Sequence, residues 1–245
     1  MRMVEILSIS LHELFGHGSK AFVFQNQFEK LTTQQQNELK TYYKQNSDVR
    51  LNLGDMRNFL EECRAEATTY CLQFDERFIS LLQIDDHEAW MAATLCNTVI
   101  YCLAPPTNVR HKDTYSVARM TIFQHCIEPI GLINESGLLK FDHQTYQKLS
   151  QNLKNFLYKI NLLMLGGNYE GAKELFGDMQ GKLELQFKKY LNFYVQFRNS
   201  KQFMQKEKFE QQKTYLLKDG CLLETQGQTL DEVYTMIQNV ELAMQ

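Results

Sequence analysis

Two short segments of the sequence carry side chains that could hold a metal ion together. Residues 12–17 read His-Glu-Leu-Phe-Gly-His, and residues 61–66 read Glu-Glu-Cys-Arg-Ala-Glu. The first segment offers two imidazoles and a carboxylate, the second offers three carboxylates, and each lies in a stretch with apolar helical periodicity. Two histidines and one carboxylate, with a coordination position left for water, form the ligand set of a catalytic zinc site.

The spacing of the two histidines predicts an irregular helix. Histidines at i and i+4 lie about 40° apart around a helix axis, whereas His12 and His17, at i and i+5, would lie about 140° apart. A single π-type turn absorbs the extra residue and returns both rings to one face. Gly16 permits such a turn most readily, because it has no Cβ atom that could clash. We therefore predict a local bulge within Leu14–His17.

The carboxylates of the two segments divide between three roles. Glu13 projects about 100° away from His12, so it overhangs the open coordination position. There it suits a general base that deprotonates the attacking water and passes the proton to a leaving amine. Glu62 is the predicted third ligand. Glu66, one turn further along the same face, and Glu61 are candidates to accept a hydrogen bond from the second nitrogen of a ligand histidine.

The alternative interpretation of the second segment is an ordinary solvated acidic face, with Arg64 balancing part of its charge. The surrounding residues argue against this interpretation, because most of them are apolar. Burying unpaired carboxylates among them would be costly, so a cation is expected nearby. These apolar neighbours are Phe59, Leu60, Ala65, Ala67, Tyr70 and Leu72.

The two motifs, H-E-x-x-G-H and E-E-C-R-A-E, resemble those of the dipeptidyl peptidase III family of zinc metallopeptidases. In that family both histidines of the first motif and the second glutamate of the other motif bind zinc. The glutamate after the first histidine is the base. The resemblance therefore implies His12, His17 and Glu62 as ligands of one zinc ion per chain, with Glu13 as the base. These are the same four residues that the spacing favours.

The resemblance also implies a catalytic histidine that this sequence replaces. The family places a histidine four residues before the arginine that corresponds to Arg119, and this histidine stabilises the tetrahedral intermediate. Tyr115 occupies that position here. A phenol can also donate a hydrogen bond to an oxyanion. We therefore expect Tyr115 and Arg119 to contact the oxyanion or the substrate.

A second expectation from the resemblance concerns the extent of the chain. The family is two-lobed, with zinc on a mainly helical lobe and a β-barrel lobe mostly upstream of the zinc motif. This chain begins eleven residues before His12, so it is similar to the C-terminal half alone. We expect one helical catalytic-lobe domain over residues 1–245, without the barrel. Apolar surface where an N-terminal lobe would dock could drive self-association.

The composition excludes several other classes of function. A net charge of −3 lacks the excess of basic residues that is typical of proteins that bind nucleic acids or anionic membranes. The longest apolar runs, such as Ile160–Leu165, are too short to span a bilayer, and residues 1–10 lack a signal-peptide core and cleavage site. Six cysteines without a C-x-x-C pair favour reduced thiols in a cytoplasmic protein.

Few prolines and many helix formers favour a mainly α chain. Asp55 and Asp142 are predicted to cap the starts of two helices, and Gly166-Gly167 closes the second of these. Short apolar runs around Asp219-Gly220 predict a small β-hairpin near the C-terminus. The expected helices are Val4–Phe15, Thr33–Gln45, 56–74, 87–103, His111–Ile127, 142–165, Asn168–Met179, Lys182–Phe197 and one beginning at Thr229.

Together these features favour an enzyme that releases dipeptides from the N-terminus of short peptides, with zinc as cofactor and Glu13 as general base. The alternative is a truncated paralogue or binding module that keeps zinc for structure. The absent upstream half favours this alternative. Glu13 discriminates between the two, because a purely structural zinc site has no need of a base at that position.

Overall fold

The computed structural model of the 245-residue chain describes residues 2–19, 21–84, 86–104, 114–133, 142–208, 213–218 and 221–226. The fold is mainly helical, as predicted. The chain divides into two compact units, Met1–Val195 and Gln196–Gln245. That residues 1–245 act as one domain stays a prediction.

The first unit contains the helices that carry both motifs. Helix α1 (Arg2–Leu11) runs directly into a π-helical turn, η1 (His12–Gly16), and then into a 3₁₀ turn, η2 (His17–Ser19). Helix α5 (Met56–Gln73) carries the second motif. The remaining helical segments are α2 (Gln25–Phe28), α3 (Thr33–Leu39), α4 (Val49–Asn52), α6 (Glu76–Leu81), α7 (His87–Cys102), α8 (Thr114–Ile122), η3 (Phe123–Ile127), η4 (Glu128–Ile130), α9 (His143–Gly166) and α10 (Tyr169–Lys208).

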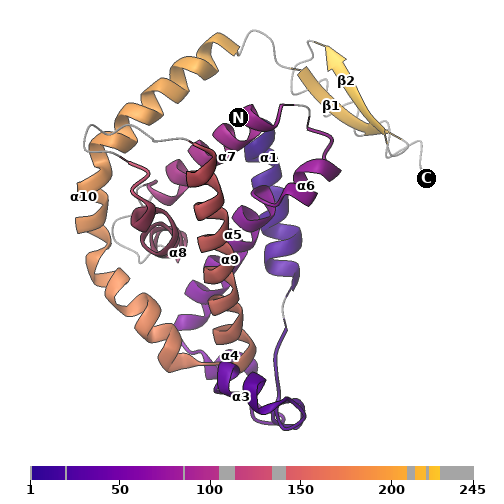
Figure 1. Cartoon of the computed structure of the whole chain (residues 1–245), viewed down its shortest axis with the longest axis vertical. Coiled ribbons are helices and arrows are strands. Elements are labelled where there is room, and N and C mark those ends of the chain that lie inside the picture. The colour runs from indigo at the N-terminus through magenta and orange to yellow at the C-terminus, as the bar shows by residue number, and fades with distance from the viewer. Residues whose placement is uncertain are drawn as a thin grey trace. The chain divides into compact units, whose positions relative to one another are not determined.

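Helix α5 lies at the centre of the helix contacts around the two motifs. It contacts α1, η1, α8 and α9 (Figure 1). Its buried apolar residues recur three or four positions apart, for example at Leu60, Cys63 and Ala67, as expected of a helix with a core-facing stripe. Arg64 and Glu66 are buried on the same helix. Buried charged groups require hydrogen-bonding or charged partners. The partners of these two side chains lie around the site described below.

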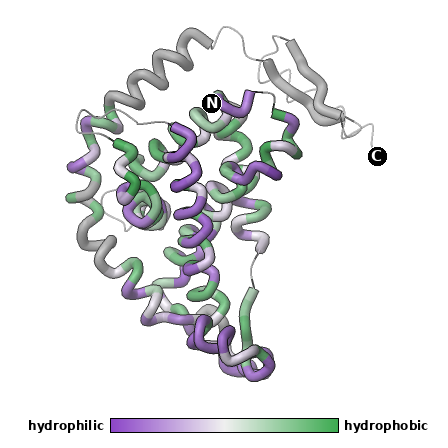
Figure 2. The backbone as a smooth tube through the Cα atoms, viewed as in Figure 1, coloured by the Kyte–Doolittle hydropathy of each residue, from purple (hydrophilic) through white to green (hydrophobic). Residues whose placement is uncertain are grey.

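Helix α9 packs against α5 with one apolar stripe. Hydrophilic and hydrophobic segments alternate along α9 in Figure 2, as expected when one face is buried and the other meets solvent. The buried apolar residues of this stripe are Tyr146, Leu149, Leu153, Phe156, Ile160, Leu163 and Met164.

The two predicted helix caps differ in the structure. The side chain of Asp142 accepts a hydrogen bond of 2.7 Å from the backbone N–H of Thr145 and so caps α9. Gly167 ends α9 with φ of 63°, and a Cβ atom there would lie 2.8 Å from the ring of Tyr43, so glycine is required. Asp55 precedes α5 as predicted, but its side chain makes no capping hydrogen bond.

Three features of the helices differ from the prediction. Helix α3 ends at Leu39 instead of Gln45, because Lys40 adopts a left-handed φ of 64°. Helix α10 is continuous where a break after Met179 was expected. A second π-helical segment, η3, follows α8 and was not predicted. The helix expected from Thr229 lies outside the described residues.

The second unit contains the predicted hairpin. Strands β1 (Lys213–Lys218) and β2 (Cys221–Gln226) pair antiparallel, and Lys218 pairs with Cys221. The predicted turn at Asp219-Gly220 lies outside the described residues. Within the described ranges this hairpin is the only sheet.

Two further observations relate to the predicted cellular location of the protein. None of the helices in the described ranges is both long and apolar enough to cross a membrane. The described cysteine side chains, Cys63, Cys71, Cys96, Cys102 and Cys126, carry free thiols. A cytoplasmic location stays a prediction.

Candidate metal centre

The π-helical turn η1 brings the two motif histidines together. The backbone N–H of His17 donates to the carbonyl oxygen of His12, which is the i to i+5 hydrogen bond of a π turn. The Nε2 atoms of His12 and His17 consequently lie 3.1 Å apart. The predicted bulge is confirmed, although it covers His12–Gly16 and so begins two residues before Leu14.

Gly16 has a second role that the sequence did not reveal. A Cβ atom on Gly16 would lie 2.7 Å from the Cα atom and 2.8 Å from the Cβ atom of Ala65 on α5. Distances this short are not tolerated, so only glycine allows η1 to approach α5 so closely. This approach brings Glu62, one turn earlier on α5, to the histidine pair.

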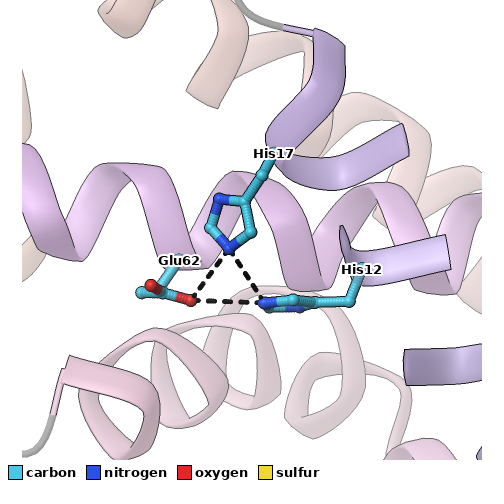
Figure 3. Close-up of side chains that lie close together, drawn as sticks. All are labelled: His12, His17 and Glu62. Carbon is cyan, nitrogen blue, oxygen red and sulfur yellow. Dashed lines mark hydrogen bonds and ion pairs between the residues drawn. The ribbon is translucent and has the colours of Figure 1, made fainter. Parts of the chain in front are cut away.

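The three predicted ligands converge on one point (Figure 3). The Oε2 atom of Glu62 lies 3.3 Å from Nε2 of His12 and 3.6 Å from Nε2 of His17. Ligands held about 2.0–2.1 Å from a zinc ion at tetrahedral angles are separated by about 3.3 Å. The three observed separations, from 3.1 to 3.6 Å, bracket this value. Among the described residues, these three form the cluster that could hold a metal ion.

The surroundings of Glu62 test whether a cation fits. Its Oε2 atom is buried and accepts no hydrogen bond of good geometry, even though Nε2 of His12 is 3.3 Å away. Leaving a buried carboxylate oxygen without a partner is costly. An ion bound between this oxygen and the two facing ring nitrogens would satisfy all three atoms, so the residues fit a bound divalent metal.

Glu61 orients the second histidine. The Nδ1 atom of His17 lies 2.8 Å from Oε1 of Glu61. When Nδ1 carries the proton, it donates a hydrogen bond to this carboxylate. The lone pair of Nε2 then points at His12 and Glu62. One of the two predicted outer partners of the ligand histidines therefore occupies the expected place.

Glu66, the other predicted outer partner, has a different neighbour. Its Oε1 atom accepts hydrogen bonds from Arg119, with Nε and Nη2 each 2.6 Å away. The expectation that Glu66 would accept from a ligand histidine is thus replaced by an ion pair between α5 and α8. Burial alone would lower the pKa of Arg119, but the charge of Glu66 raises it overall, so the guanidinium remains charged.

The local field favours positive charge at the cluster. Burial lowers the pKa of His12, but the neighbouring Glu62 carboxylate and the charges of Glu66 and Glu13 outweigh it and raise the pKa overall. Surroundings that stabilise a proton on this imidazole also stabilise a bound cation. The electrostatics therefore agree with the ligand geometry.

A cleft of about 160 Å³ adjoins His12. All three predicted catalytic residues, Glu13, Tyr115 and Arg119, line it. Glu13 is exposed, as expected of a group that must meet substrate. The ring of Tyr115 is 41% exposed and its centroid lies 6.1 Å from that of His12. The structure therefore brings the predicted base and both predicted contact residues beside the metal cluster.

Sequence reasoning missed Tyr101 on α7. The Cζ atom of Arg119 lies 5.3 Å from the ring centroid of Tyr101 and 5.4 Å from that of Tyr115. Two aromatic rings therefore flank one guanidinium. No local pattern could have identified Tyr101, because its role arises only when α7 packs against α8. His125, in η3 directly after α8, stacks on Phe156 with ring centroids 5.5 Å apart.

Comparison with known proteins adds one match. Residues 2–222 match the sequence model of a family described as Peptidase family M49. The matched range includes both motifs, the cleft and the first strand of the hairpin. A search of curated proteins found no match.

Proposed function

The chain belongs to peptidase family M49, the dipeptidyl peptidase III family of metallopeptidases, and we propose that it is a zinc peptidase that releases dipeptides from the N-terminus of short peptides. The observation that carries the proposal is the cluster of His12, His17 and Glu62, whose ligand atoms lie 3.1 to 3.6 Å apart. Membership of the family implies that the chain is a metallopeptidase. The choice of zinc, the dipeptide product and the role of each residue are proposed here.

His12, His17 and Glu62 would hold the zinc ion. When bound, zinc supplies a Lewis acid that polarises the scissile carbonyl and makes a water more acidic. Glu61 holds the proton on Nδ1 of His17, which keeps Nε2 of that ring available as a ligand. The acidic residues around His12 favour a cation there.

Glu13 moves the proton in the proposed reaction. It follows His12 directly and lines the cleft as an exposed residue, which supports the proposal that its carboxylate accepts a proton from the attacking water. It then returns this proton to the nitrogen of the leaving amine as the peptide bond breaks. A general base of this kind typically contributes about 10²- to 10⁴-fold in rate.

Tyr115 is the proposed donor to the oxyanion that forms on the scissile carbonyl. Burial, and then the charges of Glu62, Glu13 and Glu66, raise the pKa of its phenol. A raised pKa keeps the hydroxyl protonated at neutral pH, so it can donate a hydrogen bond. Arg119 is already paired with Glu66, so we propose that it supports Tyr115 and contacts the substrate.

One observation favours the second candidate, a zinc-binding module without peptidase activity. The cleft of about 160 Å³ is small beside the roughly 300–1,000 Å³ of typical ligand pockets. In this reading the same three ligands would hold zinc for structure, and short peptides would not be substrates.

Glu13→Gln separates the two candidates. We expect wild-type protein to bind one zinc ion per chain and to hydrolyse a dipeptidyl-arylamide. The variant should keep the zinc and lose at least about 100-fold in kcat. Glu174→Gln, an exposed glutamate on α10, is the matched control and should behave as wild type. Wild-type turnover no higher than that of Glu13→Gln would leave only the module, and wild-type protein without bound metal would end both candidates.

A further inference from the structure

We propose that Arg64 is a positioning residue that holds Glu61, and through it His17, in the geometry required for metal binding. This inference rests on the proposed zinc site, but it concerns a residue that is neither a ligand nor a lining residue of the cleft.

The guanidinium of Arg64 is buried beside the cluster. Its side chain is 2% exposed, although arginine is rarely buried unless it is paired. Its Nη2 atom lies 3.3 Å from Oε1 of Glu61, one turn earlier on α5. Its Nη1 atom donates to Oγ of Ser19, 2.7 Å away, in the turn that follows the first motif. A single buried cation therefore links the second motif to the turn that follows the first motif.

These contacts form a closed link between η2 and α5. His17 and Ser19 both belong to η2, and Glu61 and Arg64 both belong to α5. His17 reaches Glu61 at 2.8 Å, and Ser19 accepts from Arg64 at 2.7 Å. The turn is thus fixed to the helix at two points, which restrains the backbone that carries the ring of His17.

The central atom of this link is Oε1 of Glu61. It accepts from Nδ1 of His17 and also faces Nη2 of Arg64. A glutamate side chain has several rotatable bonds, and holding it in one rotamer requires a second contact. Arg64 supplies that contact. Removing a ligand's hydrogen-bonding partner typically lowers metal affinity by about 10- to 100-fold, so removing the residue that holds this partner should give a loss at the lower end of that range.

An arginine suits this place better than a lysine. The planar guanidinium presents several N–H groups in a fixed fork, so it can reach acceptors on two different elements at once. A lysine ammonium keeps the charge but is a flexible point donor. The geometry therefore predicts that Arg64→Lys preserves only part of the effect, which distinguishes positioning from a simple balance of charge.

The test measures zinc affinity, by competition with a chromophoric chelator, in full-length wild-type protein and in four variants. Arg64→Met should weaken zinc binding by about 10-fold, the lower end of the range for loss of a ligand's own hydrogen-bonding partner, and Arg64→Lys should recover part of this loss. Ser19→Ala removes the second attachment and should weaken binding a few-fold. Arg77→Met is the control, because this arginine is 92% exposed and pairs with Asp75 outside the cleft, and it should bind zinc as wild type does.

Cobalt(II) substitution supplies a second readout that does not depend on activity. The visible absorption of bound cobalt reports ligand geometry, so Arg64→Met should alter the spectrum while Arg77→Met should not. If far-UV circular dichroism shows that Arg64→Met does not fold, the zinc affinities and cobalt spectra of Arg64→Lys and Ser19→Ala test the positioning role, because these substitutions are milder.

The outcomes separate this inference from the proposed function. Wild-type protein that binds no zinc would refute the metal centre itself. Wild-type protein that binds zinc, with unchanged affinity and an unchanged cobalt spectrum in the folded Arg64 and Ser19 variants, would overturn the positioning role alone. Zinc affinity that falls most in Arg64→Met, less in Arg64→Lys and least in Ser19→Ala would support the positioning role.

Discussion

Gly16 lies so close to Ala65 that a Cβ atom on the glycine would be 2.7 Å from the Cα atom of the alanine. The two motif segments therefore meet backbone to backbone at this point. Gly16 directly precedes His17 in the chain, and Ala65 lies between Glu62 and Glu66 on α5. The contact sets the separation at which the ligand atoms can share one ion.

Gly16→Ala should therefore force η1 away from α5. We expect a loss of about 1–3 kcal/mol in the free energy of unfolding of the metal-free protein, as for other overpacked contacts, together with weaker zinc binding. Gly18→Ala is the control, because no atom lies within 4 Å of a Cβ built there, and it should change stability by less than about 0.5 kcal/mol. Urea unfolding measures both variants, and equal stabilities would show that the contact can relax freely.

The two aspartates that precede α9 and α5 make a matched pair. Asp142 accepts a hydrogen bond from the N–H of Thr145, whereas the side chain of Asp55 caps nothing. Asp142→Ala should therefore lower the free energy of unfolding by about 1 kcal/mol, and Asp55→Ala by much less. Thermal unfolding of the two variants provides the comparison. A larger loss for Asp55→Ala would mean that the capping assignment is wrong.

The thiols should differ in reactivity. Burial raises the pKa of Cys71 to about 12 and those of Cys63, Cys102 and Cys126 above the ordinary value, so little thiolate exists at neutral pH. Burial also raises the pKa of Cys96, but its side chain is only partly buried. Iodoacetamide at about pH 8 should label Cys96 first among these five, as followed by peptide mapping, with urea-unfolded protein as the control. Comparable labelling of Cys63 in the folded protein would contradict the burial described here.

Tyr115 should matter for rate and not for metal content. Tyr115→Phe removes the proposed oxyanion donor, so we expect zinc to be retained and kcat/KM for a dipeptidyl-arylamide to fall by about 100-fold. Tyr115→His, which introduces the residue expected from the family resemblance, should restore most of the activity. Tyr158→Phe, an exposed tyrosine on α9, serves as the control. Full activity in Tyr115→Phe would remove this residue from the mechanism.

The same donor has a defined pH dependence. The pKa of Tyr115 is raised above its ordinary value of 10.0 by burial and by nearby carboxylates. The phenol therefore donates at every pH below that raised value and loses its proton only as the pH rises through it. Between neutral pH and about 9 we expect no loss of activity from this group, and a pH profile of wild type against Tyr115→His checks the expectation.

Much of the site was predictable because local geometry constrains it. Two histidines at i and i+5 cannot share a face on a regular α-helix, so a π turn between them followed from spacing alone, although it begins two residues before the predicted bulge. A cation near the acidic residues of α5 followed because unpaired carboxylates are costly among apolar neighbours, and the family resemblance agreed on Glu62 as the ligand. The mainly α fold and the caps of α9 followed from residues with strong local preferences, such as Asp142 and Gly167.

The features that sequence missed depend on contacts between distant segments. The partner of Glu66 is Arg119, and Tyr101 flanks that arginine, because α5, α7 and α8 meet there. No pattern within a single helix encodes such a meeting. The continuity of α10 was missed for another reason. Glycine within a helix costs about 1 kcal/mol but does not break it when the flanking residues favour helix strongly.

X-ray absorption at the zinc edge tests the central claim most directly. Full-length protein loaded with one equivalent of zinc should show imidazole scattering and only nitrogen and oxygen ligands at about 2.0–2.1 Å. The His17→Ala variant should lose one of the imidazoles. A sulfur shell at about 2.3 Å, or a spectrum unchanged in His17→Ala, would show that the ion lies elsewhere and would contradict the metal centre formed by His12, His17 and Glu62.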